Sequence, residues 1–185
     1  LLHGRQHRPG TGRQEAEGSG KLQSAYAKEI ALFITAHNME NHQPQDTATT
    51  FRHELPAQLR WSDVDQFGHV NNNVYFALYD MCKTRYFLDV AGEDIFQRMA
   101  IVVANINANF LAPIYYPDEI VIQTAMERIG RKSFTLLQRA VNARTREVKC
   151  ECHTVMVCCD RQQGRAMLMP DDVRQKIEEH EGRGF

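Results

Sequence analysis

The feature that most constrains the fold is a long apolar segment that directly follows a short acidic turn. Residues 72–90 carry apolar side chains at most positions, and their polar residues come mostly late. Asn71 and Asn72 are favourable N-cap residues, because their short side chains accept hydrogen bonds from the free N–H groups of a first helical turn. A helix that is apolar nearly all round is normally buried. The sequence therefore predicts a buried helix over 72–90, around which the chain is organised.

The start of this helix is a candidate site. A helix N-terminus presents unpaired N–H donors and a partial positive charge, and here two carboxylates, Asp63 and Asp65, lie a few residues upstream. Judged on these residues alone, an Asp-X-Asp before a helix fits a metal-phosphate motif or a solvated turn equally well.

Five further segments have the length and pattern of strands, and they are residues 53–60, 99–110, 119–128, 133–143 and 147–160. The order strand, helix, four strands predicts an α+β layer pair. The pattern over residues 170–180 predicts a short closing helix after the last strand. In the second strand, the alternation places Val102 and Ile106 on the core face and Asn105 and Asn107 on the other.

The regular pattern begins at residue 51, so one domain is expected over 51–185. Residues 1–20 have almost no apolar content and are expected to be disordered, whereas 21–38 can form a short amphipathic helix. Residues 1–50 are therefore interpreted as an extension, and the native product is suspected to start at Met39. No signal-peptide or membrane-spanning pattern is present in this sequence.

Charge and cysteine content narrow the functional classes. Lys plus Arg number 22 against 23 for Asp plus Glu, so the chain has no large net charge that would attract nucleic acid or an anionic membrane. The five cysteines are odd in number and lie in apolar helix and strand patterns, which indicates reduced thiols in a cytoplasmic compartment. The Cys150-X-Cys152 segment next to His153 and the Cys158-Cys159 pair could suggest a metal site, but successive side chains of a strand point to opposite faces, so the cysteines are interpreted as structural and no metal is expected.

Three segments resemble a known family. They are Asp63-Val-Asp65-Gln-Phe-Gly68-His69-Val70-Asn71-Asn72 with Tyr75 and Asp80 after it, Phe110-Leu-Ala-Pro113 with Tyr116-Pro-Asp118-Glu-Ile120, and Ile129-Gly130-Arg131-Lys132-Ser133-Phe134. Together they resemble the 4-hydroxybenzoyl-CoA thioesterase family of hotdog-fold acyl-CoA thioesterases, over roughly residues 53–160. The resemblance implies a hotdog fold, in which an antiparallel sheet of about five strands wraps one long central helix. It also implies that two copies pair through the second strand, as a homodimer or homotetramer.

For the site, the resemblance implies that Asp65 is the catalytic carboxylate and that the backbone N–H of Asn72 is the oxyanion donor. Gly68 matches the small residue that lets the turn pass close to the substrate. A thioester carbonyl needs a nucleophile or base and donors aimed at the developing negative charge, and an ionised Asp with a helix N-terminus can supply both. Whether Asp65 attacks directly or activates water stays open.

Two further side chains are reserve candidates. His69 is interpreted as a positioning residue, with general acid as the alternative. Asp80 replaces the Glu usual in the family and is expected to pair with Lys83, Thr84 or Arg85, although related enzymes use a helix carboxylate as catalyst.

The basic hairpin is the last candidate. Arg131 and Lys132, with Ser133, are interpreted either as a solvated turn or, by the resemblance, as the residues that hold coenzyme A phosphates. The expected function is hydrolysis of an acyl-CoA to a free acid and coenzyme A, with no cofactor. A hotdog hydratase or dehydratase and a non-catalytic acyl-thioester binder remain the alternatives.

Overall fold

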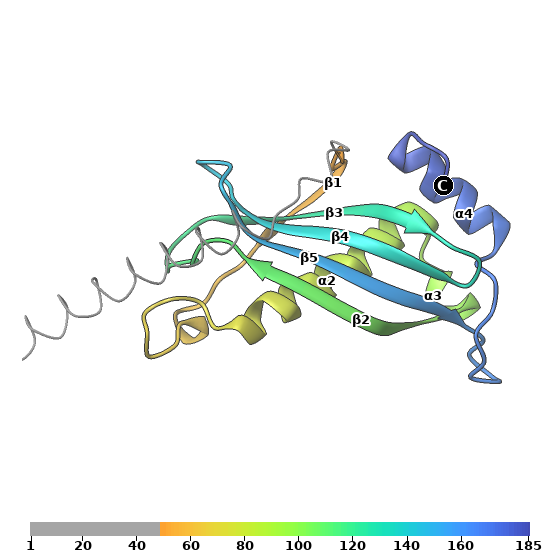
Figure 1. Ribbon diagram of the computed structural model, residues 1–185, viewed down its shortest axis with the longest axis horizontal. Helices are drawn as coiled ribbons and strands as arrows, with labels where there is room; N and C mark the ends of the chain where they lie inside the picture. The colour runs from red at the N-terminus through yellow and green to blue at the C-terminus, as the bar shows by residue number, and fades with distance from the viewer. Residues whose placement is uncertain (1–48) are drawn as a thin grey trace, which may run out of the picture.

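The computed structural model describes residues 49–185 (Figure 1). The expected disorder over 1–20, the helix over 21–38 and the start at Met39 lie outside these residues.

One antiparallel sheet holds all five predicted strands. The strands are β1 His53–Ala57, β2 Ala100–Phe110, β3 Ile120–Ile129, β4 Ser133–Asn142 and β5 Val148–Cys159. Their spatial order is β1-β3-β4-β5-β2, and each neighbouring pair is antiparallel. The predicted strands are therefore confirmed, with ends that shift by up to three residues. β1 and β2 form the two edges.

The predicted central helix is α2, Asn72–Ala91, which lies behind the sheet and runs along it in Figure 1. Its 20 residues span about 30 Å, close to the length of the ten-residue strands β3 and β4. Buried polar contacts fix the helix to the sheet, since the Tyr79 hydroxyl donates to the Cys150 carbonyl at 3.0 Å and the Gln138 amide donates to the Tyr79 carbonyl at 3.0 Å. The α+β hotdog fold is confirmed.

Three shorter helices complete the described chain. They are the 3-10 helix η1 Trp61–Asp63, α3 Ile95–Arg98 and α4 Asp171–Glu181. α4 is the predicted closing helix, and its apolar face, including Val173 and Ile177, joins the core beside the C-terminal half of α2. The four-residue α3 was not predicted, because it is too short to show a helical period.

The N-terminal and C-terminal halves of α2 pack into two different core clusters. Tyr75, Tyr79 and Cys82 belong to one, together with Cys150 and Cys152, while Tyr86 and Phe87 belong to the other, together with residues of α4. The five cysteines of the chain all lie in the described part and are free thiols, as predicted. Burial raises the pKa of the Cys82 thiol to about 11, which makes it a poor nucleophile.

Two burial predictions are wrong. α2 is not buried all round, because the sheet covers one side of it and leaves Met81 51% exposed. In β2, Val102 and Ile106 are 49% and 44% exposed instead of facing the core. The strand lies at the sheet edge and its register shifts between Val103 and Asn105, so that the simple alternation of the sequence does not hold.

Candidate active site

The acidic turn is a compact loop closed by its own backbone. Val64 and Val70 form an antiparallel bridge, the Asp65 N–H donates to the His69 carbonyl at 3.0 Å, and the Gly68 N–H donates to the Asp65 carbonyl at 3.0 Å. Gly68 has φ 86°, a left-handed conformation that other residues adopt at a cost. The turn therefore needs glycine for its backbone conformation.

The turn ends on the helix start that the sequence predicts. Asn71 is the N-cap, and its side-chain oxygen accepts from the Asn73 N–H at 3.0 Å. The Asn71 N–H donates to the Asp63 carbonyl at 2.9 Å, which ties the helix start to the acidic segment. Within residues 49–185, the N–H of Asn72 has no acceptor. It is thus an open donor at the positive end of a long helix.

Asp65 sits inside the loop with each carboxylate oxygen in a different environment. One oxygen accepts from the Phe67 N–H at 2.8 Å, and the other lies 3.8 Å from His69 Nδ1. The His69 and Asp65 side chains are 26% and 22% exposed, and the Phe67 ring stacks on the imidazole at 6.3 Å between centroids. The carboxylate is held in place and still reachable, and the His69 imidazole lies beside it, beyond hydrogen-bond distance.

The other two acidic candidates have structural partners. The Asp63 carboxylate accepts from the Arg60 backbone N–H at 2.7 Å, which is a local turn contact. Asp80 is 68% exposed and pairs with Lys83 at 2.5 Å, the expected ion pair. Eight residues of helix separate Asp80 from Asn72, about 12 Å along the axis, so Asp80 does not join Asp65 at the helix start.

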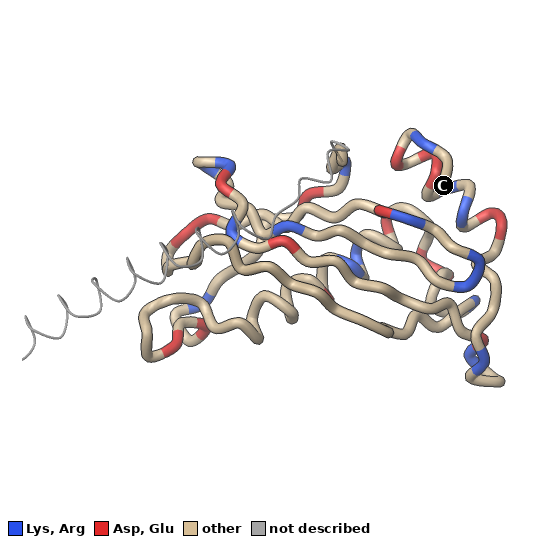
Figure 2. The backbone as a smooth tube through the Cα atoms, viewed as in Figure 1, with Lys and Arg blue, Asp and Glu red and all other residues tan. Residues whose placement is uncertain are grey.

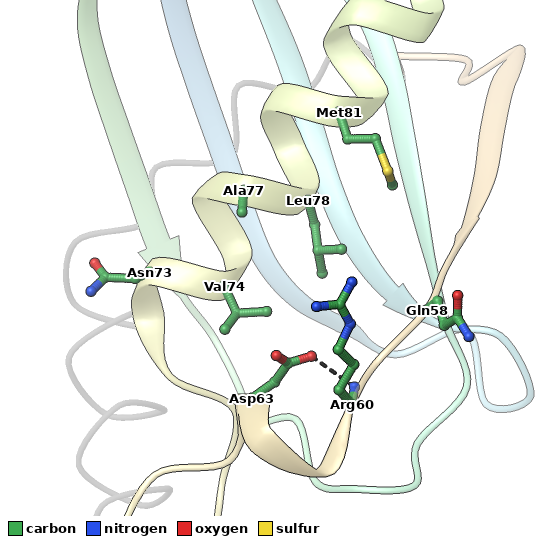
Figure 3. A pocket seen from close by; sticks show the side chains of 8 residues that line it. All are labelled: Gln58, Arg60, Asp63, Asn73, Val74, Ala77, Leu78 and Met81. Atoms are coloured by element: carbon green, nitrogen blue, oxygen red, sulfur yellow. Dashed lines mark hydrogen bonds between the residues drawn. The ribbon is translucent and has the colours of Figure 1, made fainter.

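A pocket of about 410 Å³ opens beside the first turns of α2 (Figure 3). One wall is helical and consists of Asn73, Val74, Ala77, Leu78 and Met81. The opposite wall comes from the segment that leads into the acidic turn and consists of Gln58, Arg60 and Asp63. Figure 3 shows the Arg60 side chain extending beside Leu78, with the Asp63 carboxylate nearer to Val74. The sequence reasoning missed Arg60 and Gln58, because no local pattern shows that this segment faces the helix.

The basic hairpin lies far from the acidic turn within one chain. Arg131, Lys132 and Ser133 are at the β3–β4 connection, at the end of the sheet opposite to the turn (Figures 1 and 2). Gly130 N–H donates to the Ser133 carbonyl at 2.7 Å, and Lys132 Nζ donates to the Ala166 carbonyl at 3.0 Å. The structure therefore brings Asp65, Gly68, His69 and Asn72 together but leaves the hairpin apart from them.

Neither a metal cluster nor a membrane span is found in the described part of the chain. In 49–185, no group of three or more His, Cys, Asp or Glu side chains is placed to hold a metal ion. None of the helices in the same range is long and apolar enough to cross a membrane.

Comparisons with known proteins agree on one family. The sequence model of the Thioesterase-like superfamily matches residues 59–177. The long-chain acyl-CoA thioesterase FadM of Escherichia coli (strain K12) is 26% identical over 127 residues, covering 66% of this chain and 94% of the relative. The acyl-CoA thioester hydrolase YbgC of Escherichia coli O6:H1 is 27% identical over 128 residues, covering 68% and 93%. A thioesterase of Thermus thermophilus, solved with coenzyme A and Zn, is 26% identical with a TM-score of 0.65, covering 73% and 98%.

Proposed function

The chain belongs to the thioesterase-like superfamily, and on that premise we propose that it hydrolyses an acyl-CoA thioester to a free acid and coenzyme A. The observation that carries the proposal is that the Asp65 carboxylate and the open N–H of Asn72 lie at the two ends of one short loop. These are the two groups that attack on a thioester carbonyl requires.

In this mechanism the thioester oxygen accepts from the Asn72 N–H, and the positive end of α2 stabilises the charge that develops on it. Asp65 acts either as nucleophile or as general base, and His69 positions its carboxylate. The carbon–sulfur bond breaks, and the thiolate leaves and takes up a proton. The new oxygen of the acid comes from water when Asp65 acts as base, and from the Asp65 carboxylate, which water then restores, when Asp65 acts as nucleophile. No cofactor is needed, since coenzyme A is part of the substrate.

The two roles of Asp65 predict different labelling. Direct attack forms an anhydride, and water that then adds at the Asp65 carboxyl carbon leaves the product acid unlabelled. If Asp65 instead acts as a general base, the oxygen of the attacking water enters the product acid directly. A single turnover in heavy-oxygen water that yields unlabelled acid and a labelled Asp65 would identify the anhydride route.

Coenzyme A binding in this proposal needs a second copy of the chain. The edge of β2 that does not face β5 has no strand partner within residues 49–185, and Val102, Val103 and Ile106 on this strand are 49%, 40% and 44% exposed. If two copies pair antiparallel through this edge, one end of the sheet in one copy lies beside the opposite end of the sheet in the other. The hairpin of one copy, with Arg131, Lys132 and Ser133, then lies at the end where the other copy has its acidic turn, and can bind the nucleotide phosphates.

The assembly is tested by sedimentation during turnover. A dimer or tetramer is expected as the active species. A strictly monomeric protein that still hydrolyses thioesters would remove the shared site from the proposal.

The activity itself is tested by thiol release from a panel of acyl-CoAs, run beside an enoyl-CoA hydration assay. We expect thiol release with kcat/KM of about 10⁴ M⁻¹s⁻¹ or more on the preferred acyl group. Hydration without thiol release would favour a hotdog hydratase instead. Binding of acyl-CoA without either reaction would indicate a non-catalytic binder.

A further inference from the structure

The pocket beside α2 has the size and lining of a small-molecule site. Its volume of about 410 Å³ lies in the range usual for ligand pockets, about 300–1,000 Å³. Val74, Ala77, Leu78 and Met81 give it an apolar wall along the helix. From Asn73 to Met81 this wall runs for eight residues, about 12 Å along the helix axis. A short aliphatic chain laid along α2 fits these dimensions.

A positive charge without an acidic partner projects into this apolar pocket. No carboxylate of residues 49–185 forms an ion pair with the Arg60 guanidinium, in contrast with Arg85 and Arg146, which pair with Asp89 and Glu54 at 2.7 Å. In Figure 3 the guanidinium extends along Leu78, away from the helix start. A planar guanidinium that is free of an acidic partner is well suited to bind a carboxylate through two parallel hydrogen bonds.

The one carboxylate in the pocket lies on the side nearer to the helix start. Asp63 accepts from the Arg60 backbone N–H at 2.7 Å and sits nearer to Val74 than the guanidinium does (Figure 3). This side of the pocket adjoins the candidate site, because Asn73 follows Asn72 and the Asp63 carbonyl accepts from the Asn71 N–H at 2.9 Å. The pocket therefore starts beside the proposed oxyanion donor and leads toward the cation.

We propose that this pocket receives the acyl group and that Arg60 binds a carboxylate beside Leu78, so that the preferred substrate is the coenzyme A thioester of a short dicarboxylic acid. The inference rests on the proposed thioester hydrolysis and names its substrate class. The thioester carbonyl sits at the Asn72 N–H, the methylene chain packs on Val74 and Leu78, and the terminal carboxylate meets the Arg60 guanidinium.

The test compares two thioesters of equal chain length, adipoyl-CoA and hexanoyl-CoA, which differ by the terminal carboxylate. The wild-type chain should show kcat/KM for adipoyl-CoA about five- to tenfold above hexanoyl-CoA, the scale of a charged hydrogen bond reduced by solvent exposure. Arg60→Gln should bring the ratio near one by lowering only the adipoyl-CoA value. Arg165→Gln is the matched control, an exposed arginine that does not line the pocket, and should keep the ratio.

Ala77→Leu tests whether the apolar wall is occupied. Leucine is also a good helix former, so the change adds bulk to the pocket with little effect on α2. Both six-carbon thioesters should lose efficiency relative to acetyl-CoA. An unchanged ratio to acetyl-CoA would place the acyl group elsewhere.

The outcomes separate this inference from the proposed function. Hydrolysis of both thioesters without preference, or a preference that persists in Arg60→Gln, overturns the dicarboxylate assignment and leaves the thioesterase intact. Absence of hydrolysis on any thioester refutes the function itself. In that case the methyl resonance of Met81, assigned by Met81→Leu, still reports on the pocket: a shift on adding adipoyl-CoA but not coenzyme A supports binding there, and no shift contradicts it.

Discussion

Removing the hydroxyl of Tyr86 should destabilise the fold by breaking the contact that fastens α4 to α2. Tyr86 is fully buried and donates to the Glu181 carboxylate at 2.6 Å. The same carboxylate oxygen accepts from the Met126 N–H of β3 at 2.8 Å. Burial, together with the negative charge of Glu181, raises the pKa of Tyr86 above its usual range, so the hydroxyl stays a donor at any working pH. One carboxylate thus joins a helix, a strand and the closing helix.

The expected loss of unfolding free energy depends on which buried polar groups each variant leaves without a partner. Tyr86→Phe removes one hydrogen bond to a charged group, at a cost of about 1.5–3 kcal/mol, while the Met126 N–H still donates to the carboxylate. Glu181→Ala leaves two buried donors without an acceptor and should cost more, about 3–5 kcal/mol. For a chain of this length, a loss of about 2 kcal/mol corresponds to a fall in Tm of about 4–8 °C.

Urea unfolding followed by circular dichroism measures both variants. Tyr115→Phe is the matched control, because Tyr115 is 41% exposed and should change stability by less than about 0.5 kcal/mol. A Tyr86→Phe variant as stable as wild type, or a Glu181→Ala variant no less stable than Tyr86→Phe, would contradict the role of Glu181 as the shared acceptor.

Three other perturbations test separate parts of the structure. Gly68→Ala should cost about 1 kcal/mol in thermal unfolding through backbone strain alone, since an added Cβ meets no atom within 4 Å; a neutral result would contradict the left-handed φ. Hydrogen bonds to Glu151 and Glu127 raise the pKa of His153 to about 9. The stability that protonated His153 adds is therefore complete below about pH 6.5 and is lost as pH rises through 9. His153→Gln should flatten this part of the curve of unfolding free energy against pH. Charge reversal at Arg131 and Lys132 should raise KM for acyl-CoA more than for a pantetheine thioester, and equal effects would remove the hairpin from the substrate site.

The sequence predicts local structure well where one interaction dominates. Asn71 caps α2 as expected, because capping depends only on the neighbouring N–H groups. The five strands follow from their own patterns. The faces of β2 do not, because the exposure of Val102 and Ile106 depends on the edge position and on the register shift within that strand.

Features of the site that depend on tertiary approach are not visible in the sequence. The family pattern names Arg131 and Lys132 together with Asp65 but does not say that a single chain holds them at opposite ends. Arg60 carries no motif, and its place in the pocket arises only because the segment after β1 folds against α2. Such contacts join residues that are distant in sequence, so no local period or capping pattern predicts them.

The most direct test of the account is the rate of thiol release by Asp65→Asn, measured on the preferred acyl-CoA beside Asp80→Asn. The substitution at Asp65 is nearly isosteric in a polar loop, so the fold should persist while turnover falls by about a hundredfold or more, the scale of losing a central catalytic group. Asp80→Asn removes an exposed ion pair and should stay close to wild type. Near-normal turnover by a folded Asp65→Asn variant would contradict the assignment of the catalytic carboxylate.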